Sequence, residues 1–130
     1  MDTFSRETLA PEYVTGLVEG AGSFTYSRSS KQLALYFALK LPLEDEQLLA
    51  DLQAFFGVGR IYQSRGSAYY RVTRHQDLPV IVRHFERYPL RSRKRESFEV
   101  WKQMVEAKQS FRRPDRELLD RLVAQISSRR

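Results

Sequence analysis

The spacing of hydrophobic and polar residues changes several times along this 130-residue chain, and each change marks the end of a predicted element. A short apolar segment runs from Pro11 to Gly22; proline suits the first position of a helix, and glycine commonly ends one. Residues 32–41 alternate apolar and other side chains, which predicts a strand with one buried face. The same reasoning predicts strands over 23–28, 32–41, 60–64 and 68–74, and helices over 11–21, 43–56, 76–88, 92–111 and from 114 onward.

This order of elements predicts an α+β fold. A helix, a hairpin, a second helix, a second hairpin and a third helix give the order α-β-β-α-β-β-α, to which further helices are added. Two hairpins can join into one four-stranded antiparallel sheet covered by helices on one face. The length fits a single domain over residues 1–130.

Strand alternation assigns each residue of the predicted sheet to one of two faces. The apolar face, expected to form the core, contains Phe24, Tyr26, Leu33, Leu35, Phe37, Leu39, Ile61, Tyr70 and Val72. The open face contains Thr25, Ser27, Gln32, Ala34, Tyr36, Ala38, Lys40, Tyr62, Ser64, Tyr69, Arg71 and Thr73. Such hydroxyl, amide and guanidinium groups can hydrogen-bond base edges in a DNA major groove, although a solvated sheet face has the same pattern.

Charge favours a polyanionic partner. The net charge is +6, and it is unevenly distributed: residues 1–59 carry 4 basic and 8 acidic side chains, whereas residues 60–113 carry 14 basic and 5 acidic ones. The densest basic run is 91–95. The predicted nucleic-acid contacts therefore also include the basic residues at the hairpin turns, which are Arg28, Lys31 and Arg65.

Other classes of protein are disfavoured by the composition. Cysteine is absent, which excludes a disulfide framework and a thiolate metal site. The sequence has no apolar run of membrane-spanning length and no secretory leader, so we expect an intracellular protein without a membrane partner. No feature suggests a small-molecule substrate.

The first predicted helix has a face of small residues. Gly16 and Gly20 are four positions apart and therefore lie on the same side. Such a face lets a second helix backbone approach closely, although a core helix that ends on glycine has a similar pattern.

Residues 14–22 resemble the nine-residue motif of the LAGLIDADG homing endonucleases. Gly16 and Leu17 are identical to the motif, Gly22 is its closing glycine, and Glu19 takes its first acidic position. The second acidic position, which holds the catalytic metal ion in that family, is Ala21. Further family-like segments are 55–59, 70–72 and 84–90. The family has the same order of elements, and its curved sheet forms a saddle over the DNA major groove.

The resemblance also implies an assembly. Members with one motif form homodimers in which the two motif helices pack together, and this chain contains one motif. The implied homodimer interface consists of Tyr13, Gly16, Leu17 and Gly20. A two-fold dimer is expected to bind a long pseudo-palindromic site in double-stranded DNA.

The chemistry implied by the resemblance is double-strand cleavage with divalent metal ions, usually Mg²⁺. The Ala21 side chain has no oxygen for a metal, although the Gly20 carbonyl remains. Glu19 is a weak substitute, because helical positions two apart point about 200° away from each other. The basic residue of the family's site corresponds to Lys94 or Arg93, and we favour Lys94. We therefore expect DNA binding with impaired cleavage.

Several alternatives stay open at the level of sequence. Ala21 fits a natural descendant that binds without cutting, and it also fits an engineered variant of a protein with Glu or Asp there. The family also contains RNA-intron maturases, which bind structured RNA. A basic α+β interaction module is a further alternative, and it predicts no salt-dependent affinity for nucleic acid.

Overall fold

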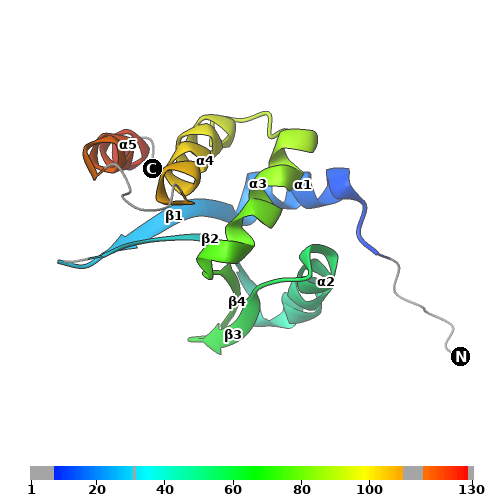
Figure 1. Ribbon diagram of the computed structural model, residues 1–130. Helices are drawn as coiled ribbons and strands as arrows, with labels where there is room; N and C mark the ends of the chain where they lie inside the picture. Colours follow the sequence, from blue (N-terminus) through cyan, green and yellow to red (C-terminus); the bar gives the residue numbers. More distant parts are fainter. Residues whose placement is uncertain (1–7, 31, 110–115, 129–130) are drawn as a thin grey trace, which may run out of the picture.

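The protein contains one antiparallel sheet with helices packed against it. The sheet is made of two hairpins that differ in length (Figure 1). The computed structural model describes residues 8–30, 32–109 and 116–128. The strands are β1 (Gly22–Arg28), β2 (Leu33–Pro42), β3 (Arg60–Ser64) and β4 (Ser67–Val72). The helices are α1 (Pro11–Ala21), α2 (Glu46–Phe56), α3 (Leu78–Arg87), α4 (Lys94–Gln109) and α5 (Arg116–Ser128).

The strands lie in the order β1-β2-β4-β3, so β2 and β4 are the inner strands. β1 and β2 pair from Gly22 and Leu39 outward to Arg28 and Leu33. β4 pairs with β2 only over Phe37–Pro42, so the β1–β2 hairpin extends beyond the other two strands (Figure 1). The predicted α+β fold with a four-stranded antiparallel sheet is confirmed.

The predicted core face of the sheet is confirmed as well. Six of its members are buried: Phe24, Leu35, Phe37, Leu39, Tyr70 and Val72. The other three are partly buried and pack against this core: Tyr26, Leu33 and Ile61. The helices cover this face, which leaves the opposite face of the sheet open for a ligand.

Aromatic packing joins the helices to the strand that follows the motif helix. The Phe24 ring lies 5.1–5.4 Å, centre to centre, from the rings of Phe85, Phe98 and Trp101. The Trp101 indole N–H donates a 3.0 Å hydrogen bond to the Thr25 carbonyl oxygen. These contacts pack the Phe24 ring of β1 against α3 and α4.

A buried histidine holds α1 against α3. The Thr15 hydroxyl donates to the Tyr88 carbonyl oxygen at 2.9 Å, so it accepts the 3.0 Å hydrogen bond from His84 Nε2. Burial lowers the pKa of His84 to about 4, against the opposing charge of Glu12. His84 is therefore neutral near pH 7.

Gly22 follows the last residue of α1, the motif helix. Glycine is needed at this position for a steric reason and not for its conformational freedom. Its backbone is extended, with φ at −96°, a conformation that any residue can adopt. A Cβ atom here would lie 2.6 Å from the Val18 Cγ1 atom and 3.2 Å from the Leu39 Cδ1 atom. Glycine is required because α1 and β2 approach each other at this point.

Several predicted boundaries shift by a few residues. Pro42 is the last residue of β2, paired with Ser67, rather than the residue after the strand. Short 3₁₀ turns, Leu43–Asp45 and His75–Asp77, precede α2 and α3 where continuous helix was expected. The predicted end of α4 and the Pro114 start of α5 lie outside the described residues. Within the described ranges, no helix is both long and apolar enough to cross a bilayer.

Candidate nucleic-acid interface

A groove of about 730 Å³ lies on the open face of the sheet, next to the end of α1. We call it the sheet groove. It brings together the predicted catalytic positions Ala21, Arg93 and Lys94 with six predicted DNA contacts, which are Thr25, Tyr36, Ala38, Lys40, Tyr69 and Arg71. Residues from α1, three strands and the start of α4 thus form one continuous surface.

Lys94 binds the C-terminal end of the motif helix. Its ammonium donates hydrogen bonds of 2.6 Å to the Gly22 carbonyl oxygen and 3.0 Å to the Val18 carbonyl oxygen. Carbonyls at a helix C-terminus carry partial negative charge and favour a cation. Burial lowers the pKa of Lys94 below its ordinary value, against the opposing effect of Glu19. The side chain therefore places a partly buried basic nitrogen next to Ala21.

Glu19 is bonded to the segment that leads into α4. Its carboxylate accepts hydrogen bonds from the backbone N–H groups of Arg91 and Ser92 and from the Ser92 hydroxyl. Burial alone raises the pKa of Glu19, but these hydrogen bonds outweigh it and lower the pKa from its ordinary value. An ionised Glu19 thus connects α1 to the basic run.

These residues do not fit a magnesium site in one chain. Magnesium favours carboxylate, phosphate and water oxygens in octahedral geometry. Ala21 offers only a methyl group, and the Glu19 carboxylate is already bonded to Arg91 and Ser92. In the described part of the chain, no group of three or more His, Asp or Glu side chains could hold a metal ion.

Five further predicted contacts lie beyond the sheet groove, towards the two ends of the sheet. Ser27 and Ala34 are opposite each other and exposed towards the tip of the β1–β2 hairpin. Tyr62 and Ser64 are exposed on β3, and Arg65 occupies the adjoining turn with a positive φ of 53°. Together they extend the polar surface from the groove towards both ends of the sheet.

Tyrosine rings surround Arg71 on this face. The guanidinium carbon lies 5.2 Å from the centre of the Tyr36 ring, 5.1 Å from that of Tyr62 and 5.8 Å from that of Tyr69. Lys40 Nζ lies 5.8 Å from the same Tyr69 ring. Cations are attracted to aromatic faces at these distances, so the rings restrict where both cations lie.

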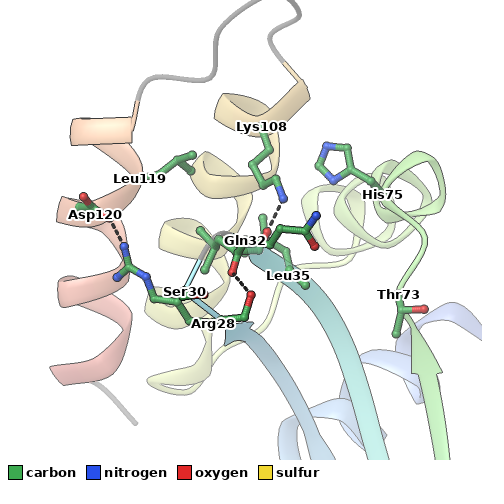
Figure 2. Close-up of a pocket in the computed structure, with 12 residues that line it drawn as sticks. Arg28, Ser30, Gln32, Leu35, Thr73, His75, Lys108, Leu119 and Asp120 are labelled. Carbon is green, nitrogen blue, oxygen red and sulfur yellow. Dashed lines mark hydrogen bonds and ion pairs between the residues drawn. The ribbon is translucent and has the colours of Figure 1, made fainter.

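Three predicted contacts lie away from the sheet groove. Figure 2 shows Arg28 directed at Asp120 of α5, with which it forms an ion pair. Gln32 and Thr73 line a second cavity of about 420 Å³, between the hairpin tip and the ends of α4 and α5. Their placement follows from the length of the β1–β2 hairpin, which continues beyond β4. Lys31 lies outside the described residues.

Sequence reasoning missed four polar residues at the sheet groove or on the same face. Ser23 and Arg60 lie on the open face, opposite Ala38 and Arg71. Strand alternation could have found both, because each precedes a predicted member by two positions. Ser92 and Ser97 also line the groove. No sequence pattern indicates them, because the position of α4 beside the groove depends on how the whole chain folds.

The predicted dimer face is open in the structure. Tyr13 is 50% exposed, Leu17 is partly buried, and a Cβ atom added at Gly16 or Gly20 would meet no atom within 4 Å. The inward side of α1 consists instead of Val14, Thr15 and Val18. Packing within the described chain therefore does not explain the two glycines.

Known proteins are similar to most of this chain. The family model described as LAGLIDADG endonuclease matches residues 14–105. An uncharacterized 50.9 kDa protein in ND4 intron 1 of Podospora anserina is 33% identical over an alignment of 113 residues, and the match covers 79% of this chain and 25% of that protein. A probable intron-encoded DNA endonuclease 1 of Mycosarcoma maydis is 31% identical over an alignment of 101 residues, and the match covers 72% of this chain and 37% of that protein. The chain thus spans little more than a third of these relatives at most.

Solved structures agree with the sequence relatives. The LAGLIDADG meganuclease I-AabMI, bound to uncleaved DNA, has a TM-score of 0.85 and 26% identity, over 92% of this chain and 44% of that one. I-GzeII in complex with its DNA target has a TM-score of 0.77 and 27% identity, over 94% and 44%. The homing endonuclease I-TnaI shares the fold, with a TM-score of 0.78 and 24% identity, over 95% and 86%.

Proposed function

Because the chain belongs to the LAGLIDADG endonuclease family, we propose that it binds double-stranded DNA through the sheet groove and the basic run beside it. The observation that carries the proposal is the composition of the groove. It combines the end of the motif helix with Lys40, Tyr69 and Arg71 of the open sheet face. A concave surface of this kind can place strands in a major groove and basic side chains near phosphates.

The proposed binding unit is a homodimer that joins two motif helices. The outward side of α1 is formed by Tyr13, Gly16 and Gly20, and each glycine leaves space for another backbone. A two-fold contact between identical faces sets two sheet grooves side by side. The matching DNA site is pseudo-palindromic.

Cleavage by this chain is proposed to be very slow. The Ala21 side chain supplies no oxygen ligand, and Lys94 is bonded to the carbonyl groups of Val18 and Gly22. An ammonium ion neutralises negative charge, but it cannot generate a metal-bound nucleophile. The proposed activity is therefore sequence-specific DNA binding, and efficient nuclease activity requires a carboxylate at position 21.

A selection experiment tests this proposal. The full chain is incubated with a randomised duplex library, bound duplexes are recovered and sequenced, and affinities are measured by fluorescence anisotropy. We expect a pseudo-palindromic consensus. Enrichment of structured RNA over every duplex, in a parallel selection, supports the maturase alternative instead. Absence of affinity for either nucleic acid supports the interaction module.

A further inference from the structure

An arginine held by three tyrosine rings lies on the floor of the sheet groove. Tyr36, Tyr62 and Tyr69 come from β2, β3 and β4, and the Arg71 guanidinium carbon lies 5.1–5.8 Å from their ring centres. The rings of Tyr62 and Tyr69 stack on each other, with centres 5.1 Å apart and planes 9° apart. Because residues of three strands contact it, the guanidinium is fixed by the sheet itself.

One nitrogen of the Arg71 guanidinium also lacks a hydrogen-bond acceptor. Its Nε atom is buried without a partner among the described residues. Its neighbours across the sheet are Ala38 on β2 and Arg60 on β3, and neither side chain carries an acceptor. A buried N–H without an acceptor is costly, and most such groups in folded proteins are satisfied. A ligand that enters the groove can provide the missing acceptor.

The position of Arg71 favours a base edge over a phosphate. β4 is an inner strand, so Arg71 lies on the floor of the groove rather than at its rim. A sheet that enters a major groove faces base edges with its floor, whereas the phosphates lie along the rims. The planar fork of arginine matches the O6 and N7 acceptors of guanine, and this is the commonest specific contact of arginine with DNA.

We propose that Arg71 reads one guanine in each half of the bound duplex, and that the three tyrosines hold the guanidinium in the plane of that base. The inference rests on the proposed DNA-binding function and adds the base and the residues that select it. The rings reduce the freedom that arginine loses on binding, so they increase discrimination between bases rather than general affinity.

The test measures binding at every position of the selected consensus. Each base pair of a half-site is replaced in turn by the other three, and affinities are determined for the unmodified protein, Arg71→Ala, Arg71→Gln and Tyr62→Leu. Lys102→Ala is the control, since Lys102 pairs with Glu86 and Glu99 on the helices. Circular dichroism and thermal unfolding verify that each variant is folded.

We expect the unmodified protein to prefer guanine at one position of each half-site by about 10-fold to 100-fold. Arg71→Ala loses this preference at that position alone, and Arg71→Gln transfers it to adenine, whose N6 and N7 atoms match an amide. Tyr62→Leu weakens the preference several-fold while Arg71 is still present, and Lys102→Ala leaves it unchanged.

Two results overturn the inference in different ways. If Arg71→Ala weakens binding to all sequences equally and lowers the salt slope by about one, Arg71 contacts a phosphate. That result leaves the proposed DNA binding intact. If the unmodified protein has no affinity for any duplex, both the inference and the proposed function are wrong.

Discussion

At the scale of single residues, His84 makes stability dependent on pH. Its pKa is about 4 in the folded protein, against an ordinary value of 6.5. Between these two pH values the unfolded chain binds more protons than the folded protein does. The contribution of His84 to the free energy of unfolding is therefore fully present above about pH 6.5, and it is lost as the pH falls towards 4. The loss approaches roughly 3 kcal/mol at the lower end. Urea unfolding at pH 7.5, 5.5 and 4.5 measures it.

The matched variants for this prediction are His84→Phe and His75→Gln. Phenylalanine suits the aromatic surroundings of His84, where the rings of Phe55, Phe56 and Phe85 lie 4.6–5.4 Å away. We expect His84→Phe to flatten the pH dependence in this range. The pKa of His75 is also lowered, by burial and by Lys108, so His75→Gln should remove a separate part of the pH dependence. An unchanged slope in His84→Phe contradicts the assignment.

A second prediction at the residue scale concerns the lost carboxylate. Ala21→Glu adds a carboxylate at the sheet groove, beside Lys94. We expect the variant to cleave both strands of the selected duplex when Mg²⁺ or Mn²⁺ is present, whereas the unmodified chain cuts extremely slowly. A plasmid nicking and linearisation assay, with a titration of divalent-metal binding, measures both effects.

Glu19→Ala is the control for that experiment. The Glu19 carboxylate is bonded to Arg91 and Ser92, so its removal in the unmodified chain should change cleavage little. Robust metal-dependent cutting by the unmodified chain would show that Ala21 is wrongly identified as the defect. If Ala21→Glu binds the target and does not cut it, the chain is better explained as a long-established binding protein than as an inactivated nuclease.

At the scale of elements, the glycine face of α1 predicts association. Gly16→Leu and Gly20→Leu should weaken the dimer, because a large side chain prevents close approach of two helices. The folded protomer should tolerate both changes, since a Cβ atom at either position meets no atom within 4 Å. Sedimentation equilibrium gives the dimer affinity, and thermal unfolding gives the protomer stability.

Gln103→Leu provides a comparison for this prediction, because Gln103 is exposed on α4. It adds the same apolar surface to another helix and should leave the dimer unchanged. A monomer of the unmodified chain at micromolar concentration counts against the proposed interface.

Elements also show what the sequence could predict and what it could not. Strand alternation identified all four strands and correctly separated Phe24 and Phe37 from Tyr36 and Arg71, because the side-chain period of a strand is local. The 3₁₀ turns before α2 and α3 were missed, because a three-residue turn that continues directly into an α-helix leaves no apolar pattern of its own. Alternation also could not show that Tyr36, Tyr62 and Tyr69 meet at Arg71. That meeting depends on the strand order β1-β2-β4-β3.

The residues of the candidate site were also predicted from the sequence only in part. The motif and the basic run indicated Ala21 and Lys94, and the fold brings both to the sheet groove. The bonds of Glu19 to Ser92 could not be predicted, because they depend on how the segment before α4 packs beside α1. The pairing of Arg28 with Asp120 likewise depends on the position of α5, which strand periodicity does not contain.

At the scale of the whole molecule, the charge distribution predicts how binding responds to salt. Residues 60–113 contain 14 basic and 5 acidic side chains, and the basic run 91–95 adjoins the sheet groove. Basic groups that neutralise phosphates release counterions, so affinity should fall by roughly 10³-fold or more between 50 and 200 mM salt. Anisotropy titrations of the selected duplex across this range give the slope.

The basic run should account for part of that slope. Arg91, Arg93 and Arg95 are exposed, and replacing all three by serine removes three charges without removing the contacts of Lys94. Each lost phosphate contact should lower the slope by about one and weaken binding to all sequences alike. A triple variant that changes base preference and keeps the slope would instead assign these arginines to base recognition. An affinity of the unmodified chain that does not vary with salt is incompatible with the proposed binding to the DNA backbone.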